Sequence, residues 1–252
     1  MDNSANVTKK NLKTALVTGA SKRIGRAIAL SLADNGYSIV IQYNNSKFEA
    51  LKLCGEIENK NVRAWPIKSD FSRRNDLESL MSKTISLAGP VSVLINNASI
   101  FQSGNIDKIN IDDFNTNMLI NAWAPFYLSR AFADSSKRGV IINITDARIP
   151  GFAPKNIAYS LSKSVLQSIT EICAAQFAPH IRVNGVAPGL ILPPSGKNAS
   201  YMEKLRKITP LCKQGTPQDI ADAIVFLVKN PFITGEILYI DGGRRHKGYC
   251  TT

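Results

Sequence analysis

Three side chains near the middle of the chain have types and a spacing that suit proton transfer: Asp146, Tyr159 and Lys163. Tyr159 and Lys163 share one face of a helix, because their spacing is one helical turn. A free phenol has a pKa of about 10, and a neighbouring ammonium favours the phenolate. We therefore expect Lys163 to bring the pKa of Tyr159 towards neutrality, so that Tyr159 delivers a proton in an enzymatic reaction.

Asp146 adds a carboxylic group to this pair if the chain folds it back onto the same face. Such a group accepts hydrogen bonds from N–H donors when ionised and donates a proton when neutral. We expect burial beside an apolar ring to raise the pKa of Asp146 and to keep that proton available. The alternative interpretation is an aspartate that caps a turn at the end of a strand.

The elements that would position these side chains alternate between strand-like and helical patterns. Apolar, β-branched runs predict seven strands, at residues 14–19, 37–43, 62–70, 91–99, 139–146, 181–190 and 236–241. Helical patterns lie between them and include Ile157–Ala178 and Pro217–Lys229. This alternation predicts right-handed crossovers and an α/β fold whose parallel sheet carries helices on both faces.

The chain shows no break in composition that would mark a second domain. We expect residues 1–11 to form a flexible N-terminal tail and residues 12–252 to form a single domain. Residues 193–200 indicate a loop that leads into a short helix. The four cysteines form no C-x-x-C pair and only two histidines are present, so we expect no metal site and no disulfide framework. The start lacks a signal-peptide core and no apolar run approaches about 20 residues, which favours a cytoplasmic protein without a membrane partner.

A glycine-containing turn, "TGASKRIG" at Thr18–Gly25, links the first predicted strand to the first helix. Gly19 permits a tight turn, Gly25 lets the helix pack closely, and the helix N-terminus offers N–H groups to a pyrophosphate. Arg23 occupies the middle position of the glycine pattern. The position of the turn after the first strand predicts a dinucleotide-binding site.

The second predicted strand ends without the acidic residue that would bind the ribose of NAD and repel a 2′-phosphate. The chain offers there Lys22, Arg23, Asn44, Asn45 and Ser46, a set that favours NADP(H). The alternative is a group of basic and polar residues on a surface loop. The net charge of +12 also suits an anionic partner, but the basic residues are scattered. No basic stripe with interleaved aromatic residues predicts nucleic-acid binding.

These motifs together resemble the short-chain dehydrogenase/reductase family over nearly the whole chain. The resemblance rests on "TGASKRIG", Asp70 after the third strand, "NNAS" at Asn96–Ser99, Asn121, "YSLSK", "APG" at Ala187–Gly189 and "DGG" at Asp241–Gly243. It implies a Rossmann-like, doubly wound, single-domain fold with a seven-stranded parallel sheet. It also implies a bound nicotinamide cofactor and a homotetramer.

Within that family the chain is similar to pteridine reductases and dihydromonapterin reductases. Most family members carry serine at the position of Asp146, whereas this subgroup carries aspartate. Arg23 at the central glycine position, Phe101 in "NNASIF" and the segment "HIRVNGVAPGLIL" also match the subgroup. The resemblance implies that Phe101 stacks on a pterin, although phenylalanine is more often a core residue in an arbitrary sequence.

The resemblance also assigns roles to individual positions. It implies catalytic roles for Asn121, Asp146, Tyr159 and Lys163, and Lys163 would also hold the nicotinamide ribose. It implies NADPH binding by Gly19, Ser21, Lys22, Arg23, Ile24, Gly25, Tyr43, Asn44, Asn45, Ser46, Asp70, Phe71, Asn97, Ala98, Tyr159, Lys163, Pro188 and Gly189. It implies substrate binding by Arg23, Ser99, Phe101, Asp146, Tyr159 and Leu190.

Asn121 has a supporting argument from the backbone. Pro125 follows one helical turn later and has no N–H, so the carbonyl of Asn121 lacks its usual helical partner. The family uses a water at this carbonyl in a proton relay to the lysine. The alternative interpretation of Pro125 is a simple kink.

The sequence thus predicts NADPH-dependent reduction of a pterin, with dihydromonapterin, a biopterin-type pterin or dihydrofolate as substrate. Asp146 would help to protonate a ring nitrogen while hydride reaches the adjacent carbon. Two alternatives stay open: a carbonyl reductase such as a 3-oxoacyl-carrier-protein reductase, and a non-catalytic NADP-binding regulator. Two interpretations of the basic C-terminal segment "GGRRHKGYC" stay open: a segment that reaches an active site of its own or of a neighbouring subunit, and a solvated tail.

Overall fold

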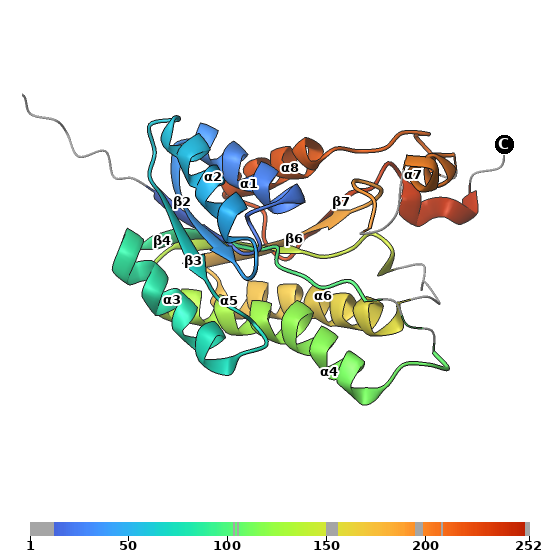
Figure 1. The fold of residues 1–252 in the computed structure, drawn as a ribbon, viewed down its shortest axis with the longest axis horizontal. Helices are drawn as coiled ribbons and strands as arrows, with labels where there is room; N and C mark the ends of the chain where they lie inside the picture. The colour runs from blue at the N-terminus through green and yellow to red at the C-terminus, as the bar shows by residue number, and fades with distance from the viewer. Residues whose placement is uncertain are drawn as a thin grey trace, which may run out of the picture.

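The computed structural model describes residues 13–102, 104, 106–149, 156–194, 199–207 and 209–249. The predicted N-terminal tail, residues 1–11, lies outside these ranges. A seven-stranded parallel sheet with strand order β3-β2-β1-β4-β5-β6-β7 forms the centre of the molecule (Figure 1). The strands are β1 (Lys13–Val17), β2 (Tyr37–Tyr43), β3 (Ala64–Lys68), β4 (Val91–Asn96), β5 (Gly139–Ile144), β6 (Ile181–Pro188) and β7 (Ile237–Ile240). All seven predicted strands are thereby confirmed.

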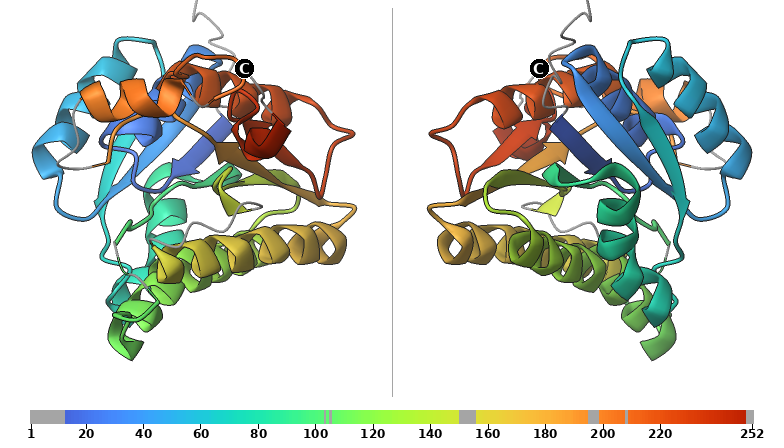
Figure 2. Two further views of the ribbon diagram at one scale, coloured as in Figure 1. Left: turned by 90° about the vertical axis from the view of Figure 1, so that its right-hand side faces the viewer. Right: turned by 90° about the vertical axis from the view of Figure 1, so that its left-hand side faces the viewer.

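Helices cover both faces of the sheet, and this explains why the strands are apolar on both faces. Every residue of β2 is buried, as expected for a strand between two helical layers. Helices α1 (Arg23–Asp34), α2 (Lys47–Glu58) and α8 (Pro217–Lys229) pack on one face, and α3 (Arg74–Ala88), α5 (Ala124–Ser135) and α6 (Ile157–Phe177) pack on the other. Both views of Figure 2 show these two layers. The predicted doubly wound α/β fold is correct.

The sequence patterns fix some helix ends closely. Helix α8 begins at the predicted residue, because Thr216 and Asp219 form a reciprocal capping box and Pro217 occupies the first turn. Helix α6 starts at the predicted Ile157 and ends one residue before the predicted end. The predicted short helix after the loop at 193–200 is α7 (Ala199–Arg206).

A π-helical turn, η1 (Leu119–Trp123), joins α4 (Ile111–Met118) to α5. Pro125 lies in the first turn of α5 and cannot donate to the carbonyl of Asn121. The predicted interruption of helical bonding at this proline therefore takes the form of a π-turn, a feature that is frequent at functional sites.

Parallel strands place their carboxyl ends at one edge of the sheet, and ligands bind such sheets at that edge, near the point where the strand order reverses. Here the order reverses between β1 and β4. The loops after β1, β4, β5 and β6 therefore define the region in which a site is expected. A C-terminal 3₁₀ helix, η3 (Arg244–Tyr249), follows β7 at the same edge.

Within the described residues, no helix is long and apolar enough to cross a membrane. The same residues contain no cluster of histidine, cysteine, aspartate or glutamate that would hold a metal ion. Cys54, Cys173 and Cys212 are free thiols. Burial raises the pKa of both Cys54 and Cys173 to about 11, which makes these thiols poor nucleophiles.

Candidate active site

The turn after β1 is held by side chains from three neighbouring strands. Gly19 has φ +60°, and its N–H donates to Oε1 of Gln42 at 2.7 Å. The hydroxyl of Thr18 accepts from the backbone N–H groups of Asn97 and Ala98, both at 2.9 Å. The side chain of Asn97 donates to the carbonyl of Thr18 at 2.9 Å and to that of Gly19 at 3.1 Å. These bonds tie the turn to the loop after β4.

Close packing requires glycine at the second glycine position of this turn. A Cβ on Gly25 would lie 2.3 Å from the carbonyl oxygen of Gly19 and 2.6 Å from Nδ2 of Asn97. The predicted role of Gly25, close approach of the helix to the strand, agrees with this geometry.

Arg23 occupies the central position of the turn with φ +55°, a left-handed conformation that favours glycine. The backbone therefore keeps the conformation of a glycine, although the side chain is an arginine. The guanidinium turns away from the second strand and donates from Nη2 to the carbonyl of Pro193 at 2.7 Å, beyond the end of β6. This contact places the Arg23 side chain beside the loop after β6, away from the predicted 2′-phosphate pocket.

The N-terminus of α1 is suited to an anion. Its N-cap residue, Lys22, makes no capping hydrogen bond with its side chain, and its first turn contains no acidic residue. The hydroxyl of Ser21 is buried without a hydrogen-bond partner. Uncapped N–H groups, a partnerless hydroxyl and nearby cations fit a phosphate group. The residues of this turn thus fit the pyrophosphate of the predicted dinucleotide.

The end of β2 provides exposed amides beside this turn. Tyr43 is buried, whereas Asn44 and Asn45 are exposed. The ammonium of Lys22 forms an ion pair with Oε1 of Glu49 at 2.7 Å in the first turn of α2. Lys22, and not Arg23, is therefore the cation that lies on the side of α2 and the exposed amides.

Asp70, after β3, is fixed by its own loop. Its Oδ1 accepts from the hydroxyl of Ser72 at 2.7 Å and from the backbone N–H of Ser72 at 2.9 Å, and these bonds lower the pKa of the carboxyl. The neighbouring Phe71 is buried. These contacts give Asp70 a defined place at the carboxyl edge.

Asp146 lies two residues beyond β5 and forms an ion pair that the sequence did not suggest. Its Oδ1 accepts from the backbone N–H of Arg148 at 2.8 Å and from Nε at 3.0 Å, and its Oδ2 accepts from Nη2 at 2.8 Å. Oδ2 also accepts from the phenol of Tyr159 at 2.7 Å. The Asp146 side chain is 12% exposed and that of Arg148 is 30% exposed.

This ion pair overturns the expected protonation of Asp146. Burial alone would raise the pKa of the carboxyl, but the hydrogen bonds and charge of Arg148 outweigh burial and hold the pKa below its ordinary value. Asp146 is therefore ionised at neutral pH and accepts hydrogen bonds. The expectation that burial keeps a proton on Asp146 is wrong, because it left out the cation two residues away.

The predicted tuning of Tyr159 by Lys163 is also wrong in this structure. Burial and the adjacent Asp146 charge raise the pKa of Tyr159 well above its usual 10.0. The ammonium of Lys163 donates to the carbonyl of Ile144 at 2.7 Å and lies 5.9 Å from the centre of the Tyr159 ring. Burial lowers the pKa of Lys163 to about 8, and the Asp146 charge partly opposes this shift. Tyr159 is thus a protonated phenol whose hydrogen bond points at a carboxylate.

Asn121 is fully buried, and its side chain joins the loop after β4 to α6. Its Oδ1 accepts from the hydroxyl of Ser99 at 3.0 Å and from the N–H of Ile100 at 2.9 Å, while Nδ2 donates to Ser162 at 3.1 Å. The amide therefore positions the loop that carries Ser99 and Phe101. Its predicted part in a proton relay stays a prediction.

Phe101 forms an aromatic wall beside the reactive groups. Its ring meets the ring of Tyr159 edge to face at a centroid distance of 4.8 Å, and the Arg148 guanidinium lies 5.0 Å from its centre. With 43% of its surface exposed, Phe101 presents a free flank. An exposed aromatic flank beside an ion pair and a phenol suits a flat, polar ring.

The segment after β6 completes the site. Leu190 is buried, and a Cβ on Gly189 would lie 2.4 Å from Cα of Asp241, so only glycine fits where the loops after β6 and β7 cross. The C-terminal Arg244 follows this crossing. Burial lowers the pKa of Arg244 and the Arg148 charge lowers it further, whereas the Asp146 charge opposes both. Residues 244–249 form the 3₁₀ helix η3, in which Arg244 is half-buried and Arg245 and His246 are exposed, and the predicted reach of this segment into an active site stays a prediction.

The structure thus gathers the predicted residues at one edge of the sheet in two groups. The first surrounds the turn after β1 and contains Gly19, Ser21, Lys22, Ile24, Gly25, Tyr43, Asn44, Asn45, Ser46, Asp70, Phe71, Asn97 and Ala98. The second contains Ser99, Phe101, Asn121, Asp146, Tyr159, Lys163, Pro188, Gly189 and Leu190, with Arg23 reaching towards its loop. Their functional roles stay predictions.

Sequence reasoning missed two residues of this region. Gln42 links the turn to β3, because its Nε2 donates to the carbonyl of Ser69 at 2.7 Å. An amide near the end of a strand that is mostly apolar was the available signal for Gln42. Arg148 pairs with Asp146 through a local turn, and its spacing in the sequence gives no such signal.

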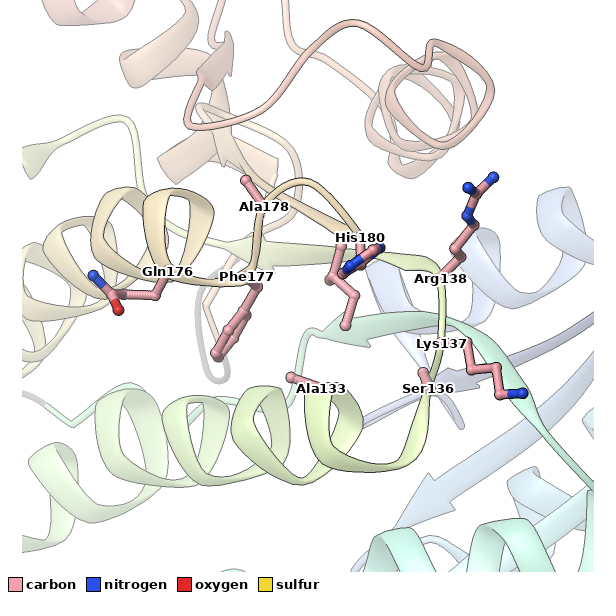
Figure 3. A pocket seen from close by; sticks show the side chains of 9 residues that line it. Ala133, Ser136, Lys137, Arg138, Gln176, Phe177, Ala178 and His180 are labelled. Carbon is pink, nitrogen blue, oxygen red and sulfur yellow. The ribbon is translucent and has the colours of Figure 1, made fainter.

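A separate hollow of about 810 Å³ lies at the opposite edge of the sheet, where β5 and β6 begin. Figure 3 shows Phe177 and Ala133 on its walls, with Lys137 and Arg138 extending away from Phe177. None of the candidate residues lines it. Because ligands bind open parallel sheets at the carboxyl ends of the strands, this hollow is not the candidate site.

Known proteins resemble this chain over nearly its full length. A family model described as enoyl-(acyl carrier protein) reductase matches residues 19–245. The 3-oxoacyl-[acyl-carrier-protein] reductase of Staphylococcus epidermidis is 30% identical, over 92% of this chain and 98% of its own. Alternative dihydrofolate reductase 1 (FolM) from Brucella canis, solved with NADP, has a TM-score of 0.89 at 28% identity and covers 93% of this chain and 94% of its own. A blue fluorescent protein from a metagenomic library, solved with NADPH, has a TM-score of 0.86 at 34% identity and covers 92% and 97%.

Proposed function

Since this chain belongs to the short-chain dehydrogenase/reductase family of oxidoreductases, we propose that it uses NADPH to reduce a pterin. The substrate class includes dihydromonapterin, biopterin-type pterins and dihydrofolate. Two solved neighbours that contain NADP or NADPH support the cofactor, and the alternative dihydrofolate reductase among them supports a pterin ring as substrate.

The observation that carries this proposal is the ionised Asp146 beside Tyr159 and Phe101. A ketone presents only an oxygen that needs a hydrogen-bond donor. A pterin presents ring N–H and amino groups, and a carboxylate is the side chain that accepts from them. The exposed flank of Phe101 offers an apolar face for the ring.

The cofactor is supported by the geometry of the turn after β1. The uncapped N-terminus of α1 and the buried hydroxyl of Ser21 fit the pyrophosphate. Lys22, which here pairs with Glu49, and the exposed amides of Asn44 and Asn45 would hold the 2′-phosphate, and β2 itself ends without an acidic residue. Bound NADPH would supply the hydride.

Tyr159 would deliver the proton to a ring nitrogen next to the carbon that is reduced. Its high pKa keeps it protonated at neutral pH, and the bond to Asp146 holds its O–H in the site. Asp146 would accept from the N–H groups of the substrate and so orient the ring. Lys163, held at the carbonyl of Ile144, would carry the charge that binds the nicotinamide ribose.

A second function has support from the sequence relatives. The relatives described as 3-oxoacyl-[acyl-carrier-protein] reductases cover nearly all of this chain and favour a carbonyl substrate. Asp146 argues against reduction of a carbonyl substrate, because a carboxylate repels the oxyanion that develops from a ketone.

A substrate panel separates the two functions. NADPH oxidation by the purified protein is followed with dihydromonapterin, dihydrobiopterin, dihydrofolate and a 3-oxoacyl thioester. We expect kcat/KM for at least one dihydropterin to exceed that for the thioester by about 10²-fold, the size of a typical contribution from one well-placed polar group. A higher kcat/KM for the thioester would replace the pterin proposal with the second function.

A homotetramer is proposed as the assembly, from the family resemblance and from one exposed face. Leu161, Val165 and Ile172 form an exposed apolar stripe along α6, and Trp123 is exposed at the end of η1, directly before the neighbouring α5. Such a stripe is typical of an interface between subunits. Light scattering coupled to gel filtration would test it, and Val165→Glu should shift the mass to a smaller species.

A further inference from the structure

The family resemblance assigns no role to Arg148, yet Arg148 contacts Asp146, Phe101 and Tyr159. Its guanidinium and its backbone N–H make three hydrogen bonds to Asp146. The guanidinium also lies 5.0 Å from the centre of the Phe101 ring and 5.4 Å from that of Tyr159. One cation thus contacts the carboxylate, the aromatic wall and the phenol.

Because Lys163 is bonded to the backbone of β5, Arg148 is the cation that can face a charge on Tyr159. The Lys163 ammonium is directed to the backbone of β5 and carries no hydrogen bond to Tyr159 or Asp146. When Tyr159 gives up its proton, a phenolate remains beside the Asp146 carboxylate at hydrogen-bond distance. Two neighbouring negative charges in a buried site are strongly unfavourable unless a cation faces both.

We propose that Arg148 is the positioning residue of this site: it keeps Asp146 ionised and oriented, and it supplies the positive charge that faces Tyr159 during proton transfer. Lys163 then binds the cofactor, whereas Arg148 positions the side chains that face the substrate. The proposal rests on the proposed function for the identity of the substrate, but the roles of Arg148, Asp146 and Tyr159 hold for any substrate that Tyr159 protonates.

The charged groups around Asp146 come from several elements. Arg148 lies on its own loop, Tyr159 and Lys163 lie on α6, and Arg244 comes from η3. Within the described residues, Arg148 is the one of these groups that forms an ion pair with Asp146, so its removal should have the largest effect on the carboxyl.

The test compares Arg148→Met, Arg148→Lys and the control Arg63→Met. Arg63 is an exposed arginine stacked on Trp65 and far along the chain from the site, so its variant removes the same charge and side-chain length. We expect Arg148→Met to lower kcat by about 10–10²-fold. Its acid limb of kcat/KM should move up by about one pH unit, because the strongest interaction that opposes the effect of burial on Asp146 is then lost. Arg148→Lys should restore part of both, and Arg63→Met should change neither.

A double mutant shows whether Arg148 acts through Asp146. In an Asp146→Asn background, Arg148→Met should lower kcat by less than about threefold, since coupled residues are not additive. A drop of kcat in Arg148→Met with an unchanged acid limb and no rescue by lysine would overturn the proposal, because a purely structural residue behaves that way. An equal effect of Arg148→Met in both backgrounds would overturn it as well.

Thermal unfolding at several pH values keeps this test independent of the substrate. A carboxyl with a depressed folded-state pKa stabilises the fold above its ordinary pKa and loses that contribution as the pH falls through the folded value. The difference in melting temperature between the parent and Arg148→Met should therefore be present at pH 7 and shrink below about pH 4. A difference that does not depend on pH would contradict the ion pair. If the parent reduces no pterin, the proposed function fails, and the pH profile is then measured on the substrate that it does reduce.

Discussion

Replacement of Asp146 by serine converts the site to the pattern that most of the family carries. Asp146 accepts three hydrogen bonds from Arg148 and one from Tyr159. A serine hydroxyl is too short and has no charge, so it retains at most the contact with Tyr159. The variant therefore removes the acceptor for substrate N–H groups and leaves Arg148 without its ion-pair partner.

The cost to stability follows from the burial of this pair. Breaking a buried ion pair costs about 3–5 kcal/mol, and an exposed pair contributes about 0–1 kcal/mol. The two side chains are 12% and 30% exposed, so solvent screening reduces the buried value to about 2 kcal/mol. For a chain of this size that loss lowers the melting temperature by roughly 4–8 °C.

The cost to activity is larger for a pterin than for a ketone. We expect kcat/KM for a dihydropterin to fall by about 10²-fold, whereas reduction of a simple ketone stays constant or improves, because serine donates to a carbonyl oxygen. The assay measures NADPH oxidation on both substrates, with Asp222→Ser, an exposed aspartate of α8, as control. Unchanged pterin turnover, together with a lower melting temperature, would mean that Asp146 is only a structural residue.

Five further variants test other parts of the site. Tyr159→Phe should lower turnover by about 10²–10⁴-fold with unchanged NADPH affinity in a fluorescence titration, and a loss of only a few-fold would refute Tyr159 as proton donor. Lys163→Met should remove activity yet raise the melting temperature at pH 7. The gain in melting temperature should disappear by about pH 10.5. A lysine whose folded-state pKa is lowered to about 8 destabilises the fold, and this destabilisation ends only when the lysine is also neutral in the unfolded chain. Lys22→Gln should weaken NADPH binding at least about tenfold more than NADH binding, whereas Arg23→Gly should leave this preference unchanged. The opposite result would mean that Arg23 binds the 2′-phosphate. Phe101→Leu should raise KM for the pterin about five- to tenfold with little change in kcat, and an unchanged KM would exclude stacking.

The fold was predictable because its signals are local. Apolar runs between helical patterns predicted all seven strands, and a helical pattern predicted the start of α8 at Pro217, where the structure has a capping box. The position of Tyr159 against Asp146 also followed from the order of the elements, because the end of β5 and the start of α6 meet at the carboxyl edge.

The electrostatics of the site was not predictable in the same way. The sequence predicts that Asp146 is buried at a strand end, but the direction of its pKa shift depends on a guanidinium that a local turn folds back onto it. The direction of the Arg23 side chain was likewise not predictable from the sequence. It follows from the left-handed backbone at the centre of the turn, which directs the side chain towards Pro193. Burial and the Arg148 charge shift the pKa of Asp146 in opposite directions, and the sequence alone did not show which of the two is larger.

The most direct test of the central claim follows the hydride itself. The protein is given NADPH that carries deuterium at the transferable position, together with equal concentrations of a dihydropterin and a 3-oxoacyl thioester. Mass spectrometry then measures the label in each product. The account predicts deuterium in the tetrahydropterin at a large excess over the 3-hydroxyacyl thioester. Deuterium confined to the thioester product would contradict pterin reduction as the function of this site.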